Sequence, residues 1–338
     1  MKLKRTLVSR DIVNYTVNES LTNTYHPVAG DLAMFEIIEI GKHQSVQSDS
    51  GRNVAIFEGD RIIAAWADRY ATSQYEGYVP TEFHEQYHIL GAGGAIGIVK
   101  SQNAALDDIL PTTVKLIGYC CDENGKVINT KFYKKERRTF NAQVPEGTKI
   151  ILSIGATMDS GKTTTAAFTA RGLKTTGKKV AFIKFTGTAY SKDKDFVMDC
   201  GADITADFSD MGFPSTYMCD KGTLLDVYQS LLGILEPHKP DYIVMEIADG
   251  LLQRETAFLL QDKAFMSTIH KVVFSCGDSL SAIQGVSVLE KYGIQPAVIS
   301  GRFTMSPLLI QEVKEYLGLP VLTIDEIMTG EHNHFFLS

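Results

Sequence analysis

A nine-residue segment, GATMDSGKT at 155–163, has the residue types that bind a phosphate group. It follows the apolar run 149–154 and precedes the helix-forming run 164–175. Backbone N–H groups of such a loop and of the helix N-terminus converge on phosphate oxygens. Lys162 is expected to reach the β- and γ-phosphates, and the Thr163 hydroxyl to bind Mg²⁺. The order of strand, loop and helix therefore predicts a nucleoside triphosphate site. The residues expected to bind the nucleotide are Gly155, Ala156, Asp159, Ser160, Gly161, Lys162, Thr163 and Thr164.

Two further groups of polar residues follow apolar runs. Lys184 ends the run 180–184, and Glu246 ends the run 242–246. An acid at the end of a strand beside a phosphate loop suits Mg²⁺, directly or through water, although it also suits helix capping. A lysine at the end of a parallel strand is expected to point into a ligand crevice and bind a carboxylate, carbamate or phosphate. The alternative is that Lys184 extends to solvent.

The elements that must position these residues alternate between strand and helix from residue 149 onward. Expected strands are 150–154, 180–184, 242–246, 271–275, 297–300 and 321–324; expected helices are 164–175, 224–235, 257–268, 279–292 and 307–317. Short apolar strands alternating with helices predict an α/β fold with a parallel sheet covered by helices on both faces. Ligands in such sheets bind at the carboxyl ends of the strands, where the three polar groups lie.

The first 145 residues are instead β-rich. Strands are expected at 31–40, 53–57, 61–66, 95–99 and 114–120, and the turn at 122–125 predicts a hairpin between 117–120 and 127–132. Many short strands with intervening glycines predict a small barrel or sandwich. We therefore expect two domains, a β-rich domain over 1–145 and a phosphate-loop domain over 148–330, with a linker near 144–147.

Several segments resemble those of dethiobiotin synthetases. The loop 155–163 has the same length and the same Gly-Lys-Thr ending, and Lys184 to Gly187 is similar to the substrate-binding Lys-Pro-Val-x-Gly segment of that family. Residues 246–250 look like its Glu-Gly-Ala-Gly-Gly metal-binding segment. Residues 194–198 resemble its Ser-Asp-Ala-Leu segment, which makes Asp195 a second expected Mg²⁺ ligand beside Thr163 and Glu246.

The resemblance covers roughly residues 148–325 and implies a P-loop fold. It also implies ATP and Mg²⁺ as cofactors, a small-molecule acid or amine as substrate, and a homodimer. Lys162, Lys184 and Glu246 would carry catalysis, in which ATP phosphorylates a carbamate that then closes into a ring.

This chain departs from the family at the substrate side. Phe185 replaces the proline after the substrate lysine, Asp249 interrupts the Gly-rich metal segment, and Gly301-Arg302 replaces the adenine-reading asparagine. These differences predict a divergent relative with another substrate. Candidate substrate contacts are Lys184, Thr186, Gly187 and Arg254. Arg254 is suited to clamp a phosphate or carboxylate, or equally to pair with a neighbouring acid.

A competing motif lies in the β-rich half. His84-Glu85-Gln86-Tyr87-His88 matches the H-E-x-x-H pattern of zinc proteases, which needs both histidines on one helix face. Pro80 precedes it and 91–94 is glycine-rich, so any helix there is short. The sequence leaves open whether the motif binds a metal or only packs.

The composition of the chain narrows the classes of partner and the cell compartment that we expect. The net charge of −7 and the absence of a long basic run argue against nucleic acid as a partner, and the patch Lys134 to Arg138 is expected to be solvated. No apolar run approaches the ~18 residues that cross a membrane. Five cysteines without C-x-x-C spacing fit reduced thiols, and hence a cytoplasmic protein.

Three functional hypotheses follow. The first is an ATP- and Mg²⁺-dependent ligase, cyclo-ligase or kinase that activates a small acid. The second is a nucleotide-dependent switch or assembly ATPase, including the metallochaperone type, that acts on a protein partner through the N-terminal domain. A third, a metallohydrolase regulated by nucleotide, rests only on the H-E-x-x-H match.

Overall fold

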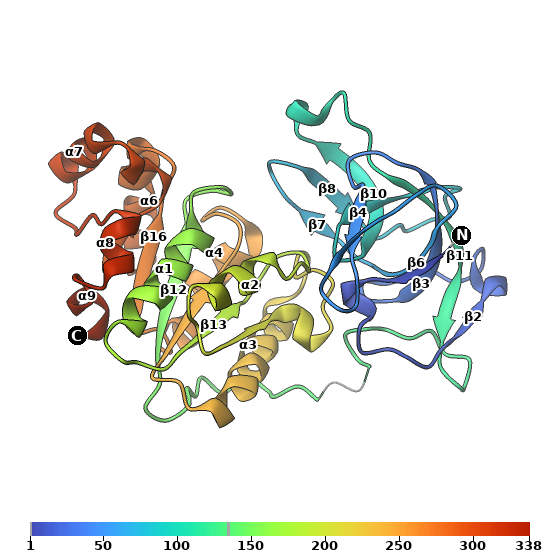
Figure 1. Ribbon diagram of the computed structural model, residues 1–338, viewed down its shortest axis with the longest axis horizontal. Helices are drawn as coiled ribbons and strands as arrows, with labels where there is room; N and C mark the ends of the chain where they lie inside the picture. Colours follow the sequence, from blue (N-terminus) through green and yellow to red (C-terminus); the bar gives the residue numbers. More distant parts are fainter. Residues whose placement is uncertain (1, 134–135) are drawn as a thin grey trace. The chain divides into compact units, whose positions relative to one another are not determined.

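The computed structural model describes residues 2–133 and 136–338, so Lys134 and Lys135 of the basic patch lie outside the described residues. The chain divides into two compact units (Figure 1). The first unit comprises Met1–Glu136 together with two later segments, Thr188–Ser191 and Phe208–Met218. The second unit contains the rest of the C-terminal half. In the described residues, no helix is both long and apolar enough to cross a lipid bilayer.

The N-terminal unit contains a small closed barrel. Its strand order β6-β3-β11-β9-β10 is completed by a further pairing between β10 and β6. The strands of this ring are β3 (Leu32–Glu39), β6 (Arg61–Trp66), β9 (Tyr87–Gly91), β10 (Ala95–Gln102) and β11 (Thr113–Cys121). Peripheral strands are β1 (Leu3–Arg5), β2 (Thr16–Asn18), β4 (Ser45–Gln47), β5 (Asn53–Ala55), β7 (Arg69–Tyr70) and β8 (Tyr75–Tyr78). Of the two expected alternatives, a barrel or a sandwich, the structure forms the barrel.

Alternating side chains of the ring strands fill the interior of the barrel. Phe35, Trp66 and Tyr87 are fully or almost fully buried, and Trp66 packs edge-on against both of the other rings. This alternation is what a sheet with one buried face produces.

One sequence expectation fails in this unit, and one motif whose role the sequence leaves open forms no helix. The predicted second strand of the hairpin, 127–132, makes only isolated bridges at Val127 and Asn129, although the turn at 122–125 forms. The H-E-x-x-H segment forms no helix, because His88 lies in β9 and its Nδ1 accepts a hydrogen bond from the Val99 N–H at 3.1 Å. Two-residue alternation in a strand points His88 away from a shared helical face.

The C-terminal unit is built on a six-stranded parallel sheet of order β14-β13-β15-β12-β16-β17. Its strands are β12 (Lys149–Gly155), β13 (Val180–Lys184), β14 (Ile204–Asp207), β15 (Tyr242–Glu246), β16 (Lys271–Ser275) and β17 (Val298–Ser300). The central strands are continuous apolar runs and are buried on both faces, as the sequence predicts for a parallel sheet. The expected strand at 321–324 forms only one bridge, between Ile299 and Val321.

The helices of this unit are α1 (Lys162–Lys174), α2 (Lys192–Asp199), α3 (Lys221–Leu235), α4 (Arg254–Leu260), α5 (Lys263–Met266), α6 (Ser279–Lys291), α7 (Pro307–Tyr316), α8 (Ile324–Thr329) and α9 (His334–Leu337). The expected helix 257–268 is two helices, because Asp262 caps α5 by accepting from the N–H groups of Ala264 and Phe265. Helix α1 follows β12 directly after the phosphate loop, and α2 begins eight residues after β13 ends (Figure 1). These two junctions, with the end of β15, position the candidate site.

Candidate functional site

The phosphate loop has the backbone geometry of an anion-binding turn. Asp159 and Gly161 both have positive φ, +61° and +97°, and α1 begins at the next residue, Lys162. Residues in this region turn successive N–H groups toward a common point. The Cβ of an alanine at Gly155 would lie 2.2 Å from the Ser160 Oγ, so the loop closes tightly on the end of β12.

Lys162 is buried at the mouth of this loop. Its side chain donates a hydrogen bond of 2.7 Å to the Thr157 carbonyl, and only 6% of the residue is exposed. Burial lowers its pKa, and the carboxylates of Glu246 and Asp249 oppose this effect. A cation held in low-dielectric surroundings beside inward-facing amides is suited to bind the terminal phosphates.

Strand register brings the other predicted residues to the same place. Lys184 of β13 is paired with Glu246 of β15, and Ser153 of β12 is paired with the same glutamate from the other side. The Lys184 Nζ lies 2.6 Å from Glu246 Oε1, and the Thr163 Oγ1 donates to that oxygen at 3.0 Å. Carboxyl ends of adjacent parallel strands thus gather lysine, glutamate and threonine at one edge, as the sequence predicted.

Asp193 joins this group from the first turn of α2. Its Oδ2 lies 2.8 Å from the Lys184 Nζ, so that this lysine bridges two carboxylates. Burial would lower the pKa of Lys184, but the two carboxylates outweigh it and raise that pKa. Burial would raise the pKa of Asp193, and the Lys184 ammonium reverses this and lowers it. Lys184 and Asp193 therefore both carry their charges near neutral pH.

The residues present fit a Mg²⁺ ion. Glu246 is 1% exposed, and its Oε2 has no hydrogen-bond partner among the described residues. A buried carboxylate oxygen without a donor is costly unless a cation or water meets it. The Thr163 hydroxyl lies on the same carboxylate. In the part of the chain that is described, no three His, Cys, Asp or Glu side chains gather to bind a metal by themselves. Mg²⁺ does not need such a cage, since phosphate and water supply most of its ligands.

A cavity of about 480 Å³ encloses these groups. Its lining residues are Met158, Asp159, Gly161, Lys162, Thr163, Thr164, Lys184, Asp193, Glu246, Ala248, Asp249 and Arg302. The cavity thus unites the phosphate loop with the ends of β13 and β15. Its residues all belong to the C-terminal unit.

Other predicted residues lie elsewhere. Asp195 is exposed on α2 and is not part of the lining, whereas Asp193 is. Residues two apart on a helix face different directions, so the geometry favours Asp193 over Asp195 as the acid at the cavity. Arg254 donates to the Cys219 carbonyl at 3.0 Å, pairs with Glu255 and covers the Phe258 ring, which matches the alternative of local pairing.

The predicted substrate segment after Lys184 is largely structural. Phe185 is fully buried against Tyr228 and Phe265. The Thr186 Oγ1 both donates to the Ala248 carbonyl and accepts from the Ala248 N–H, each at 2.9 Å. Thr186 and Gly187 are also absent from the cavity lining.

Two lining residues, Asp193 and Arg302, lie outside every segment that the sequence assigns to the site. The segment that resembles the related family begins at residue 194 and indicates Asp195 instead of Asp193, and Arg302 stands where that family has its adenine-reading asparagine. The position of Arg302 follows from the Gly301 turn after β17, where the Arg302 N–H donates to the Ser160 carbonyl of the phosphate loop at 3.1 Å. A cation at the end of a further strand of the sheet was the available signal.

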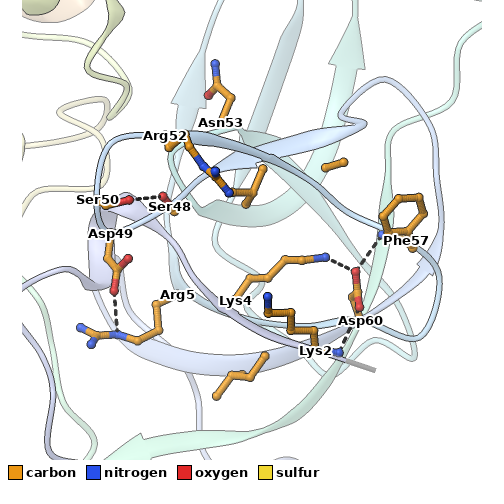
Figure 2. Close-up of a pocket in the computed structure, with 13 residues that line it drawn as sticks. Lys2, Lys4, Arg5, Ser48, Asp49, Ser50, Arg52, Asn53, Phe57 and Asp60 are labelled. Atoms are coloured by element: carbon orange, nitrogen blue, oxygen red, sulfur yellow. Dashed lines mark hydrogen bonds and ion pairs between the residues drawn. The ribbon is translucent and has the colours of Figure 1, made fainter.

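A larger cavity, of about 870 Å³, lies in the N-terminal unit between β1 and β5 (Figure 2). Four cations line it, namely Lys2, Lys4, Arg5 and Arg52. Lys4 pairs with Asp60, and the Arg5 Nε lies 3.6 Å from Asp49. This cavity contains no part of the phosphate loop, and both acids that line it, Asp49 and Asp60, are paired with cations.

Comparisons with known proteins assign no family. No family model matches the chain, and no curated protein matches it. Solved structures match with low scores. The 54 kDa signal recognition particle protein from Aeropyrum pernix, in complex with GDP, has 17% identity and a TM-score of 0.40 over 58% of this chain and 48% of its own. The chain therefore spans about half of that protein.

Two other solved structures match this chain with similarly low identity and TM-score. The hydrogenase maturation factor HypB from Archaeoglobus fulgidus has 12% identity and a TM-score of 0.35, over 52% of this chain and 81% of its own. The cell division protein FtsY from Thermotoga maritima has 15% identity and a TM-score of 0.38, over 59% of this chain and 68% of its own. The assignment of the C-terminal unit as a P-loop-like α/β fold rests on the strand order and loop described above.

Proposed function

We propose that this protein is a Mg²⁺-dependent nucleoside triphosphatase. The observation that carries the proposal is the convergence of Lys162, Thr163 and Glu246 at the end of a phosphate loop between a parallel strand and a helix. Loop amides and Lys162 would bind the β- and γ-phosphates. Thr163 and Glu246 would hold Mg²⁺, which neutralises charge that develops on the transferred phosphoryl group.

Hydrolysis is favoured over transfer to an acceptor by the state of Lys184. This side chain was expected to bind an acidic acceptor, but its ammonium lies between Asp193 and Glu246, at 2.8 and 2.6 Å. A lysine that pairs with two carboxylates, one of them buried, is not free to bind a third. Its role in the proposed reaction is to hold both carboxylates in place, so that Asp193 orients the attacking water.

A second candidate is phosphoryl transfer to a small carboxylic or carbamic acid, as in the ligases that the sequence resembles. It is favoured by Arg302, whose side chain lines the cavity and offers a planar cation suited to a carboxylate. In this version ATP is the donor, and the acid replaces water as the acceptor.

Phosphate release by the full-length protein separates these candidates. We would supply Mg-ATP or Mg-GTP, alone and with pools of small acids and amines, and use Lys162→Ala as the control. The proposal predicts release that no pool changes and that falls by about 10²-fold or more in the variant. Stimulation by one pool would instead establish the second candidate. Activity that persists in Lys162→Ala, or no activity with either nucleotide, would contradict both.

A further inference from the structure

The larger cavity of the N-terminal unit, which we call the basic cavity, has walls that backbone hydrogen bonds hold together (Figure 2). Strand β1 pairs in parallel with β6, and strands β4 and β5 form a hairpin whose turn lies at 48–52. The Ser48 N–H donates to the Arg52 carbonyl at 2.8 Å within this turn, and the Asp49 N–H donates to the Arg5 carbonyl of β1 at 3.1 Å. All residues that line the cavity belong to the N-terminal unit.

Asp60, one of the two acids of the basic cavity, is fully engaged by the protein. It is 7% exposed, pairs with Lys4, and accepts from the backbone N–H groups of Lys2 and Phe57 at 3.2 and 3.1 Å. Burial would raise the pKa of Asp60, but the Lys4 ammonium and the two N–H groups outweigh it and lower that pKa. Asp60 therefore carries its charge and neutralises Lys4.

The second acid, Asp49, is associated with Arg5. The Arg5 Nε lies 3.6 Å from the Asp49 carboxylate. The guanidinium of Arg5 also donates to three carbonyl groups at 2.8, 3.1 and 2.8 Å, those of Ser9, Arg10 and Ile12. An arginine with this many acceptors in the protein has few donors left for a ligand.

Lys2 and Arg52 are the cations that remain for a ligand. Within the described part of the chain, neither side chain forms a hydrogen bond or an ion pair. Because the other two cations face the two acids, these two side chains give the basic cavity a net charge of +2. Such a recess attracts anions, and its charge matches that of a phosphomonoester, which is about −1.5 to −2 near neutral pH.

An exposed aromatic ring also lines the basic cavity. Phe57 is 66% exposed, and the Lys4 Nζ lies 5.5 Å from the centre of its ring. Figure 2 shows this ring on the opposite side of the cavity from Arg52. Val54 and Ala55 of β5 add further apolar lining. The cavity volume of about 870 Å³ is that of a small-molecule site, and the lining suits an anion with a planar apolar part.

We propose that the basic cavity binds a small phosphomonoester that carries an aromatic group. The phosphate would lie between Lys2 and Arg52, and the ring would contact Phe57. Arg52 can bind two phosphate oxygens through parallel N–H donors, and Lys2 adds a point charge. The cations share one recess and do not follow a track, which favours a small molecule over a nucleic-acid strand. This binding is independent of the nucleotide cavity, because it uses residues of the N-terminal unit alone.

Isothermal titration with phenyl phosphate and with inorganic phosphate tests the proposal. Every protein is the full-length chain with Lys162→Ala, so that the phosphate loop does not contribute to binding. The cavity variant also carries Lys2→Gln with Arg52→Gln, both at exposed positions. The matched control carries Lys115→Gln with Lys126→Gln, which removes the same charge from exposed positions outside the basic cavity.

We expect phenyl phosphate to bind at one site, severalfold more tightly than inorganic phosphate. Its Kd should rise about tenfold or more in the cavity variant, because two charge-assisted contacts are lost, and stay within about twofold in the control. Phe57→Ala should weaken the binding of phenyl phosphate severalfold and leave that of inorganic phosphate unchanged. Phenyl phosphate should also slow hydrogen exchange of the amides at 48–52, which locates the site at the hairpin turn.

Equal affinity of the cavity variant and the control for phenyl phosphate would overturn the proposal, and so would the absence of binding at millimolar concentration. The proposal also fails if phenyl phosphate binds no more tightly than inorganic phosphate, or if Phe57→Ala changes neither affinity. All variants should have the same melting temperature, since the substituted side chains are exposed. A loss of binding that appears only with a lowered melting temperature would show a structural effect and contradict the assignment of Lys2 and Arg52 as ligand contacts.

Discussion

Asp193 and Asp195 show how a single residue position decides the chemistry of this site. Both are acids in the first turn of α2, but only Asp193 lines the cavity and pairs with Lys184. A resemblance between short segments pointed to Asp195, because sequence alone does not fix where the helix starts or which face it turns inward. Helical geometry separates residues two apart by about 200°.

Substituting each acid in turn tests this assignment. Asp193→Asn keeps the side-chain size but removes the charge that faces Lys184, so we expect kcat to fall at least tenfold. Asp195→Asn is the matched control, and its kcat should stay within about twofold of the wild type. Steady-state phosphate release measures both. The reverse order would restore Asp195 as the functional acid.

His43 is a residue-scale source of pH-dependent stability in the N-terminal unit. Burial, reinforced by Arg69 and Lys42, lowers its pKa to about 3. In the unfolded chain a histidine has a pKa of about 6.5 and binds a proton at mildly acidic pH, whereas the folded form does not. The contribution of His43 to the free energy of unfolding is therefore fully present above pH ~6.5, and it is lost as the pH falls toward 3.

The variant His43→Gln removes this contribution. Between pH 6.5 and 5.0 the wild type should lose up to about 2 kcal/mol more unfolding free energy than the variant, since one pKa unit corresponds to about 1.4 kcal/mol. Urea denaturation at the two pH values provides the comparison. Equal losses in both proteins would show that His43 titrates normally in the folded state.

At the scale of elements, the sequence predicts best where hydrophobicity and position agree. Strands β13 and β15 have their predicted bounds, because each is an apolar run closed by one charged residue. The apolar pattern does not predict strand β14, since Ile204–Asp207 is short and half polar. Strand β9 is not predicted either, because the H-E-x-x-H segment at 84–88 overlaps its start and suggests a helix there. Helix α2 was missed because its run of charged residues has little apolar periodicity.

The sequence likewise predicts those residues of the candidate site that lie beside strongly apolar strands. Lys162, Thr163, Lys184 and Glu246 were found because each ends or follows a strong element, and parallel strands bring their carboxyl ends together. The place of Asp193 in the cavity is not predictable, because the charged run at the start of α2 does not indicate which of its acids faces inward.

The phosphate loop itself can be tested at this scale. Gly155→Ala places a Cβ 2.2 Å from the Ser160 Oγ and 2.6 Å from the Lys162 Cγ, so the loop must open. We expect nucleotide affinity to fall at least tenfold, with the melting temperature lowered by a few degrees. Gly277→Ala is the matched control, because a Cβ there meets no atom within 4 Å. Unchanged affinity in Gly155→Ala would argue against nucleotide binding in this loop.

At the scale of the whole molecule, the two halves of the sequence do not match the two units of the structure. Residues 208–218, like residues 188–191, belong to the C-terminal half of the chain but pack in the N-terminal unit. Met211 and Phe213 are buried there, and a Cβ on Gly212 would lie 2.0 Å from the Thr130 carbonyl oxygen. The C-terminal half is thus not a self-contained domain.

A fragment of residues 137–338 tests this interdependence. Removing the barrel exposes Met211 and Phe213, and each buried side chain of this kind contributes roughly 2 kcal/mol. We expect the fragment to melt well below the full-length protein and to aggregate on heating. Calorimetry of both proteins is the measurement. A fragment that melts cooperatively at the temperature of the intact chain would mean that the two segments do not need the barrel.

The proposed function requires that the cavity at β12, β13 and β15 binds a nucleoside triphosphate with Mg²⁺. Isothermal titration of a non-hydrolysable triphosphate, with and without Mg²⁺, tests it most directly, and Lys162→Ala serves as the comparison. We predict one site per chain, an affinity that falls at least tenfold without Mg²⁺, and no measurable binding in the variant. Equal binding by the wild type and Lys162→Ala, or none by either, would contradict the proposal that this cavity binds a nucleoside triphosphate.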